Sequence, residues 1–416
     1  MDELLTKAEA VRTAARKLGL ASTDAKNTGL AAIADALLAH RDAILAANAA
    51  DMAAAEKSGM AAAMLDRLRL DGKRLEAMAS DVRAVAALPD PIGEVYDQTL
   101  RPNGLRIHKR RVPMGVIGVV YEARPNVTSD VAALCLKTGN AAILRGGHEA
   151  LRGNIAIVAA VSAGLTASGL PVDAVQLITD SGRDVVGQLL KMRGYIDVII
   201  PRGGAGLIRF VAENSTIPVI ETGAGVCHTY VDKDANPDMA AKIVYNAKVR
   251  RPTICNALDA VLIHKDIART TLPVIARSLA AAGVELRCDP AALAIIPAHG
   301  KPAAESDWGK EFLALIAAIK VVDSLDEALD HIARYGSGHS EAIVTGDEAA
   351  ARRFLNEVDA AAVYWNASTQ YTDGGEFGLG AEIGISTQKL HARGPMALRE
   401  LTTYKWVIEG TGQVRP

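Results

Sequence analysis

The chain has 416 residues, which is too long for one ordinary hydrophobic core, so two or three domains are expected. Hydrophobic residues make up 50% of it and charged residues 23%, a composition typical of soluble globular proteins. A net charge of -2 gives no electrostatic reason to expect nucleic acid or an anionic membrane surface as a partner.

The cysteine pattern and the start of the chain are typical of a cytoplasmic protein. Four cysteines without paired spacing do not make a disulfide framework, and no CxxC metal pattern occurs. The nine histidines show no ligand spacing with carboxylates or thiols, so no metal is expected. Residues 1–5 lack the features of a signal peptide, and no uninterrupted apolar run is long enough to span a bilayer.

Helical periodicity dominates the beginning of the chain. It predicts consecutive helices from residue 2 to about 87, interrupted near Gly19 and Gly59. The segment 94–111 then alternates apolar and polar residues around Asn103-Gly104, which predicts a two-stranded hairpin. We interpret its basic cluster at 106–111 as a solvated strand face, given the neutral overall charge.

From residue 112 the pattern becomes strand, helix, strand. The run 115–121 is continuously apolar, as in a strand buried on both faces. Three further apolar runs, separated by helical stretches, are predicted as strands: 141–144, 174–178 and 197–200. This alternation predicts a parallel sheet with right-handed crossovers, which is the doubly wound α/β architecture.

A second α/β series is predicted after Cys255. Its apolar strands are expected at 260–263, 294–296, 319–322, 341–345 and 361–364. A glycine-rich segment, 371–386, follows, and 400–409 is predicted as a closing strand. No long linker or internal repeat separates the two halves.

Two glycine turns each follow a predicted strand and precede a helix. The residues that they contribute are Arg145, Gly146 and Gly147 in the first turn, and Arg202, Gly203, Gly204 and Gly206 in the second. Glycines at such turns let an anion approach backbone N–H groups and the positive end of a helix. The alternative explanation is that the glycines of each turn only permit its tight backbone geometry. Two turns with an arginine each favour a phosphate-bearing cofactor.

Pro125-Asn126 directly follows the first strand of the α/β series. Ligands of α/β folds gather at the carboxyl ends of strands, and the amide of Asn126 can donate to a developing oxyanion. Taken alone, this feature is explained more simply by an Asx turn after proline.

Cys255 lies just past a predicted helix end, behind Arg250, Arg251 and Pro252. Positive charge and partial exposure lower the pKa of a thiol and make it a nucleophile, whereas a lone intracellular cysteine is often a small core residue. The local sequence leaves both interpretations open.

These features occur in an order that resembles the aldehyde dehydrogenase superfamily. The segments that carry the resemblance are Pro125-Asn126, the run 139–145, the motif 221–225, Cys255 34 residues after Glu221, and Glu311-Phe312. Within the superfamily, the segments 225–228, 251–256 and 335–340, and above all 377–395, resemble the γ-glutamyl phosphate reductase family. The resemblance covers essentially the whole chain. It implies an α/β, aldehyde dehydrogenase-like fold with two doubly wound domains and a small β bridging element.

The activity implied by the resemblance is the NADPH-dependent reduction of L-glutamyl 5-phosphate to L-glutamate 5-semialdehyde plus phosphate, the second step of proline biosynthesis from glutamate. Cys255 would form a thioester, and the side chain of Asn126 with the backbone N–H of Cys255 would hold the oxyanion. Glu311 would join the two glycine turns in binding the cofactor. Arg124 and Arg251 are candidates for the substrate carboxylate or phosphate, or for scaffold ion pairs.

Two positions depart from the wider superfamily. In hydrolytic relatives the glutamate at the position of Glu221 activates water, but here phosphate is the acyl acceptor in the reverse direction. We therefore interpret Glu221 as a structural or gating carboxylate. NAD-preferring relatives carry a carboxylate where this chain has His148. Because its loss removes repulsion of a 2′-phosphate and Arg145 supplies a partner, NADPH is expected over NADH.

The predicted domains are an NADPH-binding domain (1–94 and 113–228), a catalytic thiol domain (229–365) and bridging or oligomerisation segments (95–112 and 366–416). The hairpin cannot bury its own faces, so a homo-oligomer, either a dimer or a tetramer, is expected. No kinase region precedes the reductase region, so a separate glutamate 5-kinase is the implied source of the substrate.

Two other functions stay open. One is an acylating or ordinary aldehyde dehydrogenase for another small acid aldehyde. The other is a catalytically inactive relative with a structural or regulatory role, against which the presence of Cys255, Asn126 and both glycine turns argues.

Overall fold

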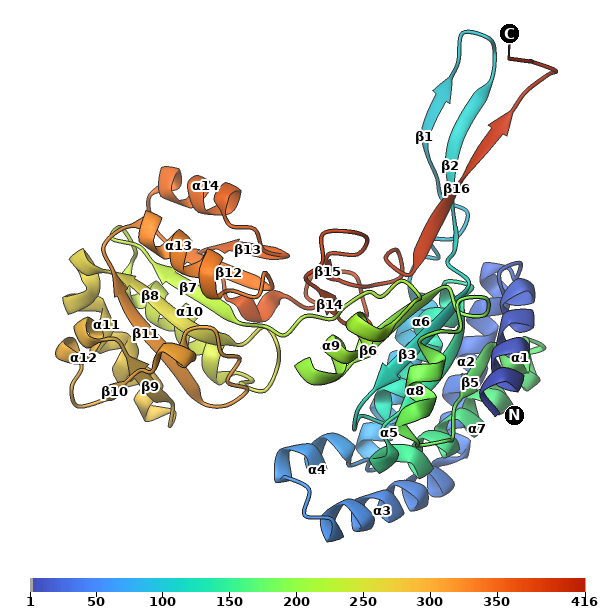
Figure 1. Cartoon of the computed structure of the whole chain (residues 1–416), viewed down its shortest axis with the longest axis horizontal. Helices are drawn as coiled ribbons and strands as arrows, with labels where there is room; N and C mark the ends of the chain where they lie inside the picture. Colours follow the sequence, from blue (N-terminus) through green and yellow to red (C-terminus); the bar gives the residue numbers. More distant parts are fainter. Residues whose placement is uncertain (1–2, 416) are drawn as a thin grey trace. The chain divides into compact units, whose positions relative to one another are not determined.

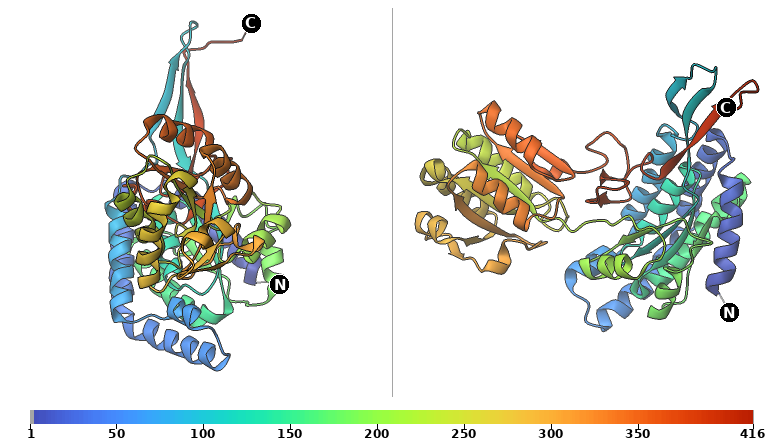
Figure 2. Two further views of the ribbon diagram at one scale, coloured as in Figure 1. Left: turned by 90° about the vertical axis from the view of Figure 1, so that its left-hand side faces the viewer. Right: turned by 45° about the horizontal axis from the view of Figure 1, so that its top comes forward.

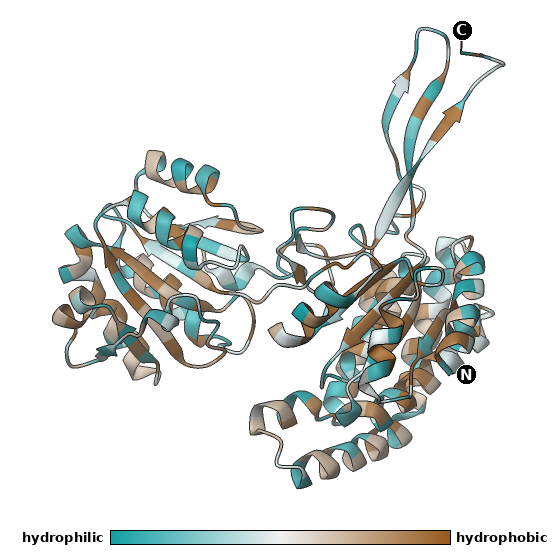
Figure 3. Cartoon of the chain, in the orientation of Figure 1, coloured by the Kyte–Doolittle hydropathy of each residue, from teal (hydrophilic) through white to brown (hydrophobic). Residues whose placement is uncertain are grey.

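The computed structural model describes residues 3–415, which form two compact units. The first unit contains the chain up to residue 222, together with 378–384 and the residues from 396 on. The second contains 223–377 and 385–395. Figure 1 labels the helices and strands of both units in chain order. Each unit has its own parallel sheet, and both sheets consist largely of hydrophobic residues (Figure 3).

Five helices open the first unit, as the periodicity predicted. They are α1 (Glu3–Leu18), α2 (Thr23–Ala39), α3 (Arg41–Lys57), α4 (Ala62–Leu68) and α5 (Gly72–Ala87). Side-chain caps fix two of their starts, since Ser22 accepts from the backbone N–H of Ala25 and Asp71 from that of Arg74. The buried face of α2 packs against α5 and α7.

The sheet of the first unit has the strand order β5-β4-β3-β6, and all its pairings are parallel. Its strands are β3 (Val116–Tyr121), β4 (Ala141–Gly146), β5 (Val175–Leu177) and β6 (Val198–Arg202). The crossover helices are α6 (Asn126–Lys137), α7 (Leu151–Ser168), α8 (Arg183–Leu189) and α9 (Ala205–Asn214). All six residues of β3 are buried, which confirms the prediction of a strand covered on both faces.

One helical stretch in residues 3–415, His148–Ser168, is long and apolar enough to cross a membrane by length and composition. It contains α7, which joins the parallel strands β4 and β5 and packs against α2 and α3. These contacts are those of a crossover helix in an α/β fold.

The predicted hairpin is confirmed and has a third strand. β1 (Val95–Leu100) and β2 (Arg106–Pro113) pair antiparallel, and Gly104 of the connecting turn has a φ of 86°. β16 (Thr402–Glu409), the predicted closing strand, pairs with β2 along its whole length. The three strands extend away from the rest of their unit and are called the arm below (Figures 1 and 2).

The second unit has a seven-stranded sheet in the order β10-β9-β11-β8-β7-β12-β13, again entirely parallel. The strands are β7 (Cys227–Val231), β8 (Leu258–His264), β9 (Glu285–Cys288), β10 (Gly300–Pro302), β11 (Ile316–Val322), β12 (Ser340–Val344) and β13 (Ala362–Trp365). The helices are α10 (Pro237–Val249), α11 (Lys265–Ala281), α12 (Pro290–Ile295), α13 (Leu325–Tyr335) and α14 (Glu348–Glu357). One apolar cluster joins α10, α11 and α12 to the sheet, and another joins α13 and α14 to it.

The expected strand at 294–296 is wrong. Ala294 and Ile295 end helix α12, which starts after Asp289 caps the backbone N–H of Ala292 and Pro290 occupies the first turn. The apolar run is too short to distinguish a strand from the buried side of a helix. The short strands β9 and β10 were missed because neither contains a continuous apolar run.

The division between the units lies at residues 222 and 223, whereas the expected domain boundary lay at 228 and 229. The difference is the segment 223–228, which includes the first two residues of β7, and β7 pairs with β8 and β12 of the second sheet. Of the terminal segment 366–416, the parts up to 377 and from 385 to 395 belong to the second unit. The two-residue strands β14 (Ile385–Ser386) and β15 (Gly394–Pro395) pair with each other.

Candidate active site

The four cysteines differ in their access to solvent. Cys135, Cys227 and Cys288 are buried, whereas Cys255 is half-buried. Burial raises the pKa of Cys135 and of Cys288 to about 12, and it raises that of Cys227 well above its ordinary value. Because the thiolate is the reactive form, the three buried thiols are inert by comparison. Cys255 is thus the thiol that a substrate can reach.

The loop that carries Cys255, residues 250–257, joins α10 to β8 in the second unit. Helix α10 ends at Val249, which confirms the predicted helix end before the thiol. Asn256 is buried, and its side-chain Nδ2 donates to the carbonyl oxygens of Gln370 at 3.2 Å and Thr372 at 3.0 Å. The hydroxyl of Thr369 donates to the Asn256 carbonyl oxygen at 2.7 Å. The segment 369–372 therefore holds the thiol loop in place.

A glycine packs directly against the backbone of Cys255. A Cβ atom at Gly225 would lie 1.5 Å from the carbonyl oxygen of Cys255, so the main chain can approach this closely only at a glycine. The backbone N–H of Gly225 donates to Oε1 of Glu311 at 3.0 Å. The structure thus brings together three residues from distant parts of the sequence, including the predicted site residues Cys255 and Glu311.

The two arginines before the thiol have different surroundings. Nη1 of Arg250 donates to Oε1 of Gln370 at 3.3 Å, so this guanidinium helps to anchor the loop. Arg251, the substrate candidate, is exposed. A solvated guanidinium four residues from the thiol can meet an anionic substrate without first breaking a buried contact.

Asn126 and Arg124 lie in the first unit, at the carboxyl end of β3. Asn126 is exposed and begins α6, with Pro125 as the residue before the helix. Its Nδ2 donates to Oδ2 of Asp130, one turn along the same helix, at 2.8 Å. The side chain therefore bonds to a carboxylate, not to the local backbone as an Asx turn requires.

The two glycine turns flank the strand that precedes Asn126. Tyr121, the last residue of β3, is in register with Gly146 on one side and Arg202 on the other. The chain runs from β3 outward to β4 and β5, then returns to place β6 on the opposite side of β3. Such a reversal of strand order is where α/β folds bind ligands, which agrees with the predicted cofactor turns.

In the first turn, Arg145 contacts the main chain. Its guanidinium donates to the carbonyl oxygens of Gly146 at 2.9 Å and Ser181 at 2.7 Å, and burial lowers its pKa. A Cβ at Gly147 would lie 2.1 Å from the carboxylate of Glu149. His148 is 81% exposed. A carboxylate therefore lies beside this turn, at Glu149, one residue after His148.

In the second turn, a carboxylate accepts from the backbone at the start of α9. The N–H of Gly204 donates to Oε2 of Glu122 at 2.9 Å, and a Cβ at Gly203 would lie 2.6 Å from the same oxygen. The N-terminal end of a helix favours a negatively charged hydrogen-bond acceptor. The space around Gly206 is open. In both turns a glutamate carboxylate thus lies against a glycine, and in the second turn it accepts from a backbone N–H of that turn.

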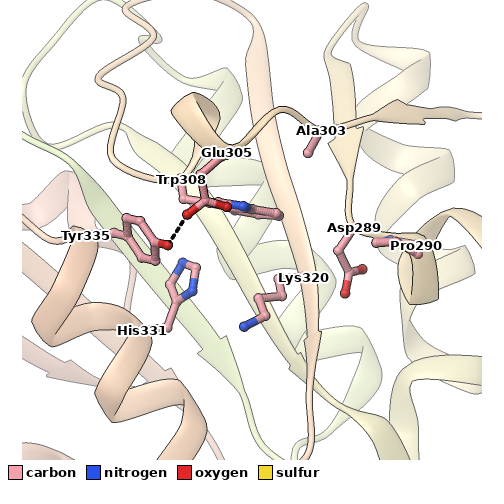
Figure 4. A pocket seen from close by; sticks show the side chains of 8 residues that line it. All are labelled: Asp289, Pro290, Ala303, Glu305, Trp308, Lys320, His331 and Tyr335. Carbon is pink, nitrogen blue, oxygen red and sulfur yellow. Dashed lines mark hydrogen bonds between the residues drawn. The ribbon is translucent and has the colours of Figure 1, made fainter.

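A cavity of about 360 Å³ opens in the second unit, and its lining residues point toward one another in Figure 4. They are Asp289, Pro290, Ala303, Glu305, Trp308, Lys320, His331 and Tyr335. The hydroxyl of Tyr335 donates to Glu305, and Lys320 pairs with Glu327 at 2.8 Å. None of the predicted site residues lines this cavity, so it is not the predicted thiol site.

Comparison with known proteins decides the family. The model of the aldehyde dehydrogenase family matches residues 4–293. A gamma-glutamyl phosphate reductase of Dehalococcoides mccartyi strain CBDB1 is 56% identical over 417 residues, covering 99% of this chain and 98% of that protein. One from Roseiflexus castenholzii is 58% identical over 412 residues, with 97% of each chain covered. The crystal structure of gamma-glutamyl phosphate reductase from Thermotoga maritima has 48% identity and a TM-score of 0.98 over 100% of both chains.

The chain belongs to the gamma-glutamyl phosphate reductases of the aldehyde dehydrogenase family. The predicted resemblance, the fold class and the enzyme class are thereby confirmed, and the chain is an oxidoreductase of the aldehyde dehydrogenase type. A nicotinamide cofactor follows from this family.

The sequence segments that carried the resemblance contact one another in the fold. The backbone N–H of Val226 donates to the hydroxyl of Ser337 at 2.8 Å, which joins two of these segments. In the first unit, a Cβ at Gly384 would lie 2.4 Å from Nη1 of Arg202. Gly384 has a φ of +150°, and its missing side chain makes room for that guanidinium.

Sequence reasoning missed several residues that shape the site. These are Asp130, Asn256 in its anchoring role, Thr369, Gln370 and the contact of Gly225 with Cys255. A carboxylate four residues after Asn126 on a predicted helix was a usable signal, because residues i and i+4 share a helix face. The other contacts join residues far apart in the chain and left no local pattern.

Proposed function

We propose that the chain reduces L-glutamyl 5-phosphate to L-glutamate 5-semialdehyde and phosphate with NADPH, as the second step of proline biosynthesis from glutamate. The observation that carries the proposal is the half-buried Cys255, on a loop that Gly225 and the segment 369–372 hold in place. The names of the relatives, which are 56% and 58% identical, support this substrate. We also propose the cytoplasm as its compartment.

Cys255 begins the proposed reaction as a thiolate that attacks the acyl carbon of the substrate. The carbon–sulfur bond forms as the bond to phosphate breaks, and phosphate leaves with the bonding electrons, which gives a thioester on Cys255. NADPH, when bound, supplies the hydride that reduces the thioester carbon. Collapse of the resulting tetrahedral anion expels the thiolate, so the aldehyde leaves and Cys255 is regenerated.

Asn126 and the backbone N–H of Cys255 are the proposed donors to the tetrahedral oxyanion. Each such donor contributes about 3 kcal/mol to the stability of the transition state. Asn126 keeps one N–H of its amide for this purpose, because Asp130 accepts from Nδ2 and the group carries two hydrogens. Arg251, exposed near the thiol, and Arg124 are proposed to bind anionic groups of the substrate.

The two glycine turns are proposed to hold the cofactor, through the backbones of Gly146, Gly147, Gly203 and Gly204 with Gly206 in the first turn of α9, and Arg202 beside them. Arg145 is the proposed partner of the 2′-phosphate, and Glu311 the proposed contact on the thiol side. Since Glu149 lies beside the first turn, preference for NADPH requires its carboxylate to stay with the backbone N–H of Ala123, to which it bonds at 2.7 Å. Equal kcat/KM with NADH and NADPH would contradict this assignment.

Glu221 is proposed not to be a general base. In the reverse reaction phosphate accepts the acyl group, so an activated water would hydrolyse the thioester before the acyl phosphate could form. Oxidation of glutamate 5-semialdehyde should therefore require phosphate or arsenate. Equal rates without either anion would favour the hydrolytic aldehyde dehydrogenase instead.

Replacement of each cysteine tests the proposal most directly. Cys255→Ser should reduce NADPH-linked reduction of L-glutamyl 5-phosphate by at least about a thousandfold, because the nucleophile is lost. Cys135→Ser, Cys227→Ser and Cys288→Ser, replaced singly, are the matched controls, since those thiols are buried. Their turnover should fall only as far as their stability does. Near-normal turnover of Cys255→Ser would refute the mechanism.

A homo-oligomer and a separate glutamate 5-kinase complete the proposal. The former is inferred from the arm, and the latter is the proposed source of L-glutamyl 5-phosphate.

A further inference from the structure

The carboxylate that holds the amide of Asn126 has no role in the reaction proposed above. Asp130 lies four residues after Asn126 on α6, so both side chains leave the same face of the helix. Oδ2 of Asp130 accepts from Nδ2 of Asn126 at 2.8 Å. Asn126 is exposed, whereas Asp130 is half-buried, so the carboxylate is the fixed member of the pair and the amide the reachable one.

An asparagine amide has two nearly isosteric ends of opposite hydrogen-bonding character. Rotation by 180° exchanges the oxygen, which only accepts, for the NH2 group, which only donates. An oxyanion needs the donor end. At an exposed helix start, without a partner that distinguishes the two ends, the Asn126 amide would adopt both orientations.

An ionised carboxylate removes this ambiguity, because it only accepts hydrogen bonds. Next to such a group Nδ2 must face Asp130, and the second N–H of the same nitrogen is held in a fixed direction. We propose that Asp130 is a positioning residue, which orients the Asn126 amide so that its remaining N–H meets the oxyanion formed at Cys255. This inference rests on the proposed role of Asn126.

The protonation of Asp130 makes the proposed device sensitive to pH. Burial raises the pKa of Asp130 to about 7, in opposition to the hydrogen bond from Asn126. The charged groups acting on it from neighbouring elements are Asp81 of α5, which raises the pKa, and Arg202 of β6, which lowers it. A protonated Asp130 can donate to Oδ1 of Asn126 and so hold the amide the wrong way round. Turnover should therefore fall as the pH drops through about 7.

The test is a double-mutant cycle on the full-length enzyme, with kcat and KM measured for NADPH-linked reduction of L-glutamyl 5-phosphate. Asp130→Ala should lower kcat roughly ten- to a hundredfold with little change in KM, because a misplaced donor acts on the transition state. In the Asn126→Ala background, Asp130→Ala should have no further effect, because it acts only through that amide. Asp130→Glu, which keeps an acceptor, should recover part of the loss.

The outcomes separate this inference from the proposed function. If Asn126→Ala lowers kcat but Asp130→Ala does not, or if their effects multiply, the positioning role is refuted and the proposed reaction stands. If Asn126→Ala leaves kcat unchanged, the oxyanion role of Asn126 fails, and the positioning role fails with it.

The dependence of kcat on pH distinguishes the positioning role from a purely structural role of Asp130, which would leave this dependence unchanged. Asp130→Asn cannot titrate, so the acid-side fall of kcat near pH 7 should disappear. Asp81→Asn removes a negative charge beside Asp130 and should shift that fall to lower pH. A profile identical to that of the unchanged enzyme in both variants would overturn the inference, provided that thermal unfolding shows both to be folded.

Discussion

The proposed nucleophile of this enzyme, Cys255, packs against a residue without a side chain. Gly225 lies against the carbonyl of Cys255 and donates its own N–H to Glu311. These contacts restrict where the backbone of Cys255 can lie. Any side chain at residue 225 has to displace main-chain atoms, which cannot rotate away as the end of a flexible side chain can.

Gly225→Ala is therefore expected to impair catalysis more than folding. The added Cβ would start 1.5 Å from the Cys255 carbonyl oxygen, so the loop has to shift, and a shift of about 1 Å costs roughly a hundredfold in kcat. The measurements are kcat and the rate of Cys255 alkylation. Gly187→Ala in α8 is the control, because the space around Gly187 is open and alanine favours a helix by about 1 kcal/mol. Normal kcat for Gly225→Ala would contradict this account.

At this scale the sequence indicated the proposed nucleophile but not its support. Cys255 became a candidate through its place in an ordered series of motifs, and Asn126 through its place after a buried strand. The anchoring of Asn256 by Thr369 spans 113 residues, and that of Gly225 by Glu311 spans 86. Contacts of this range depend on how the whole sheet brings its loops together, and no local pattern records them.

Among the elements, α2 is tied to the connection between α5 and the arm by a buried ion pair. Nζ of Lys26 lies 2.6 Å from Oδ2 of Asp90, and the two side chains are 2% and 5% exposed. Burial raises the pKa of Asp90, but the hydrogen bonds from Lys26, Ile92 and Thr23 and the charge of Lys26 together outweigh burial, and the pKa is lowered. The hydroxyl of Thr23 and the N–H of Ile92 donate to the same carboxylate.

Lys26→Ala is expected to lower the free energy of unfolding by about 3–5 kcal/mol, because it leaves a buried carboxylate without its cation. Arg41→Ala breaks the exposed pair with Glu76 and should cost less than about 1 kcal/mol. Chemical denaturation at pH 7 measures both. The pKa of Asp90 is lowered from its ordinary value of 3.8. The contribution of Asp90 to the free energy of unfolding is therefore present above pH 3.8, and it is lost as the pH falls through the pKa of the folded state. Equal costs for the two variants would contradict the assignment.

Elements were predictable where burial imposed a continuous apolar run. β3, β4, β6, β8, β11 and β12 all read as such runs, and all are strands. Prediction failed at Ala294 and Ile295, because this short apolar run belongs to the end of a capped helix. It also failed at β9, where partly exposed residues alternate with buried ones. Short elements carry too few side chains for either period to be distinguished.

For the whole molecule, the arm exposes several large apolar side chains next to one another. Tyr404, Trp406 and Ile408 are 46%, 53% and 55% exposed. As alternate residues of β16 they share one face of the strand. Lys109 covers part of this face, with its Nζ 5.0 Å from the Trp406 ring centroid. Three strands with an apolar face and no helix over it are marginal alone, which is why we expect a second copy of the chain to cover them.

The double variant Trp406→Lys/Ile408→Lys should therefore reduce the oligomer to a smaller species without unfolding the chain. Light scattering coupled to size-exclusion chromatography measures the mass, and circular dichroism checks the fold. Lys405→Gln, on the opposite face of β16, is the control and should leave the mass unchanged. An unchanged mass for the double variant would exclude this face of the arm as the interface.

The anchoring of the thiol loop by residues 369–372 also has a consequence for protein synthesis. The ribosome adds Asn256 to the chain 113 residues before Thr369, so Asn256 has no partner in that segment during the interval. A chain that terminates early keeps an unanchored loop and leaves the Asn256 amide without its carbonyl acceptors. Only a chain that extends past Thr372 can therefore anchor the loop of the proposed nucleophile in this way.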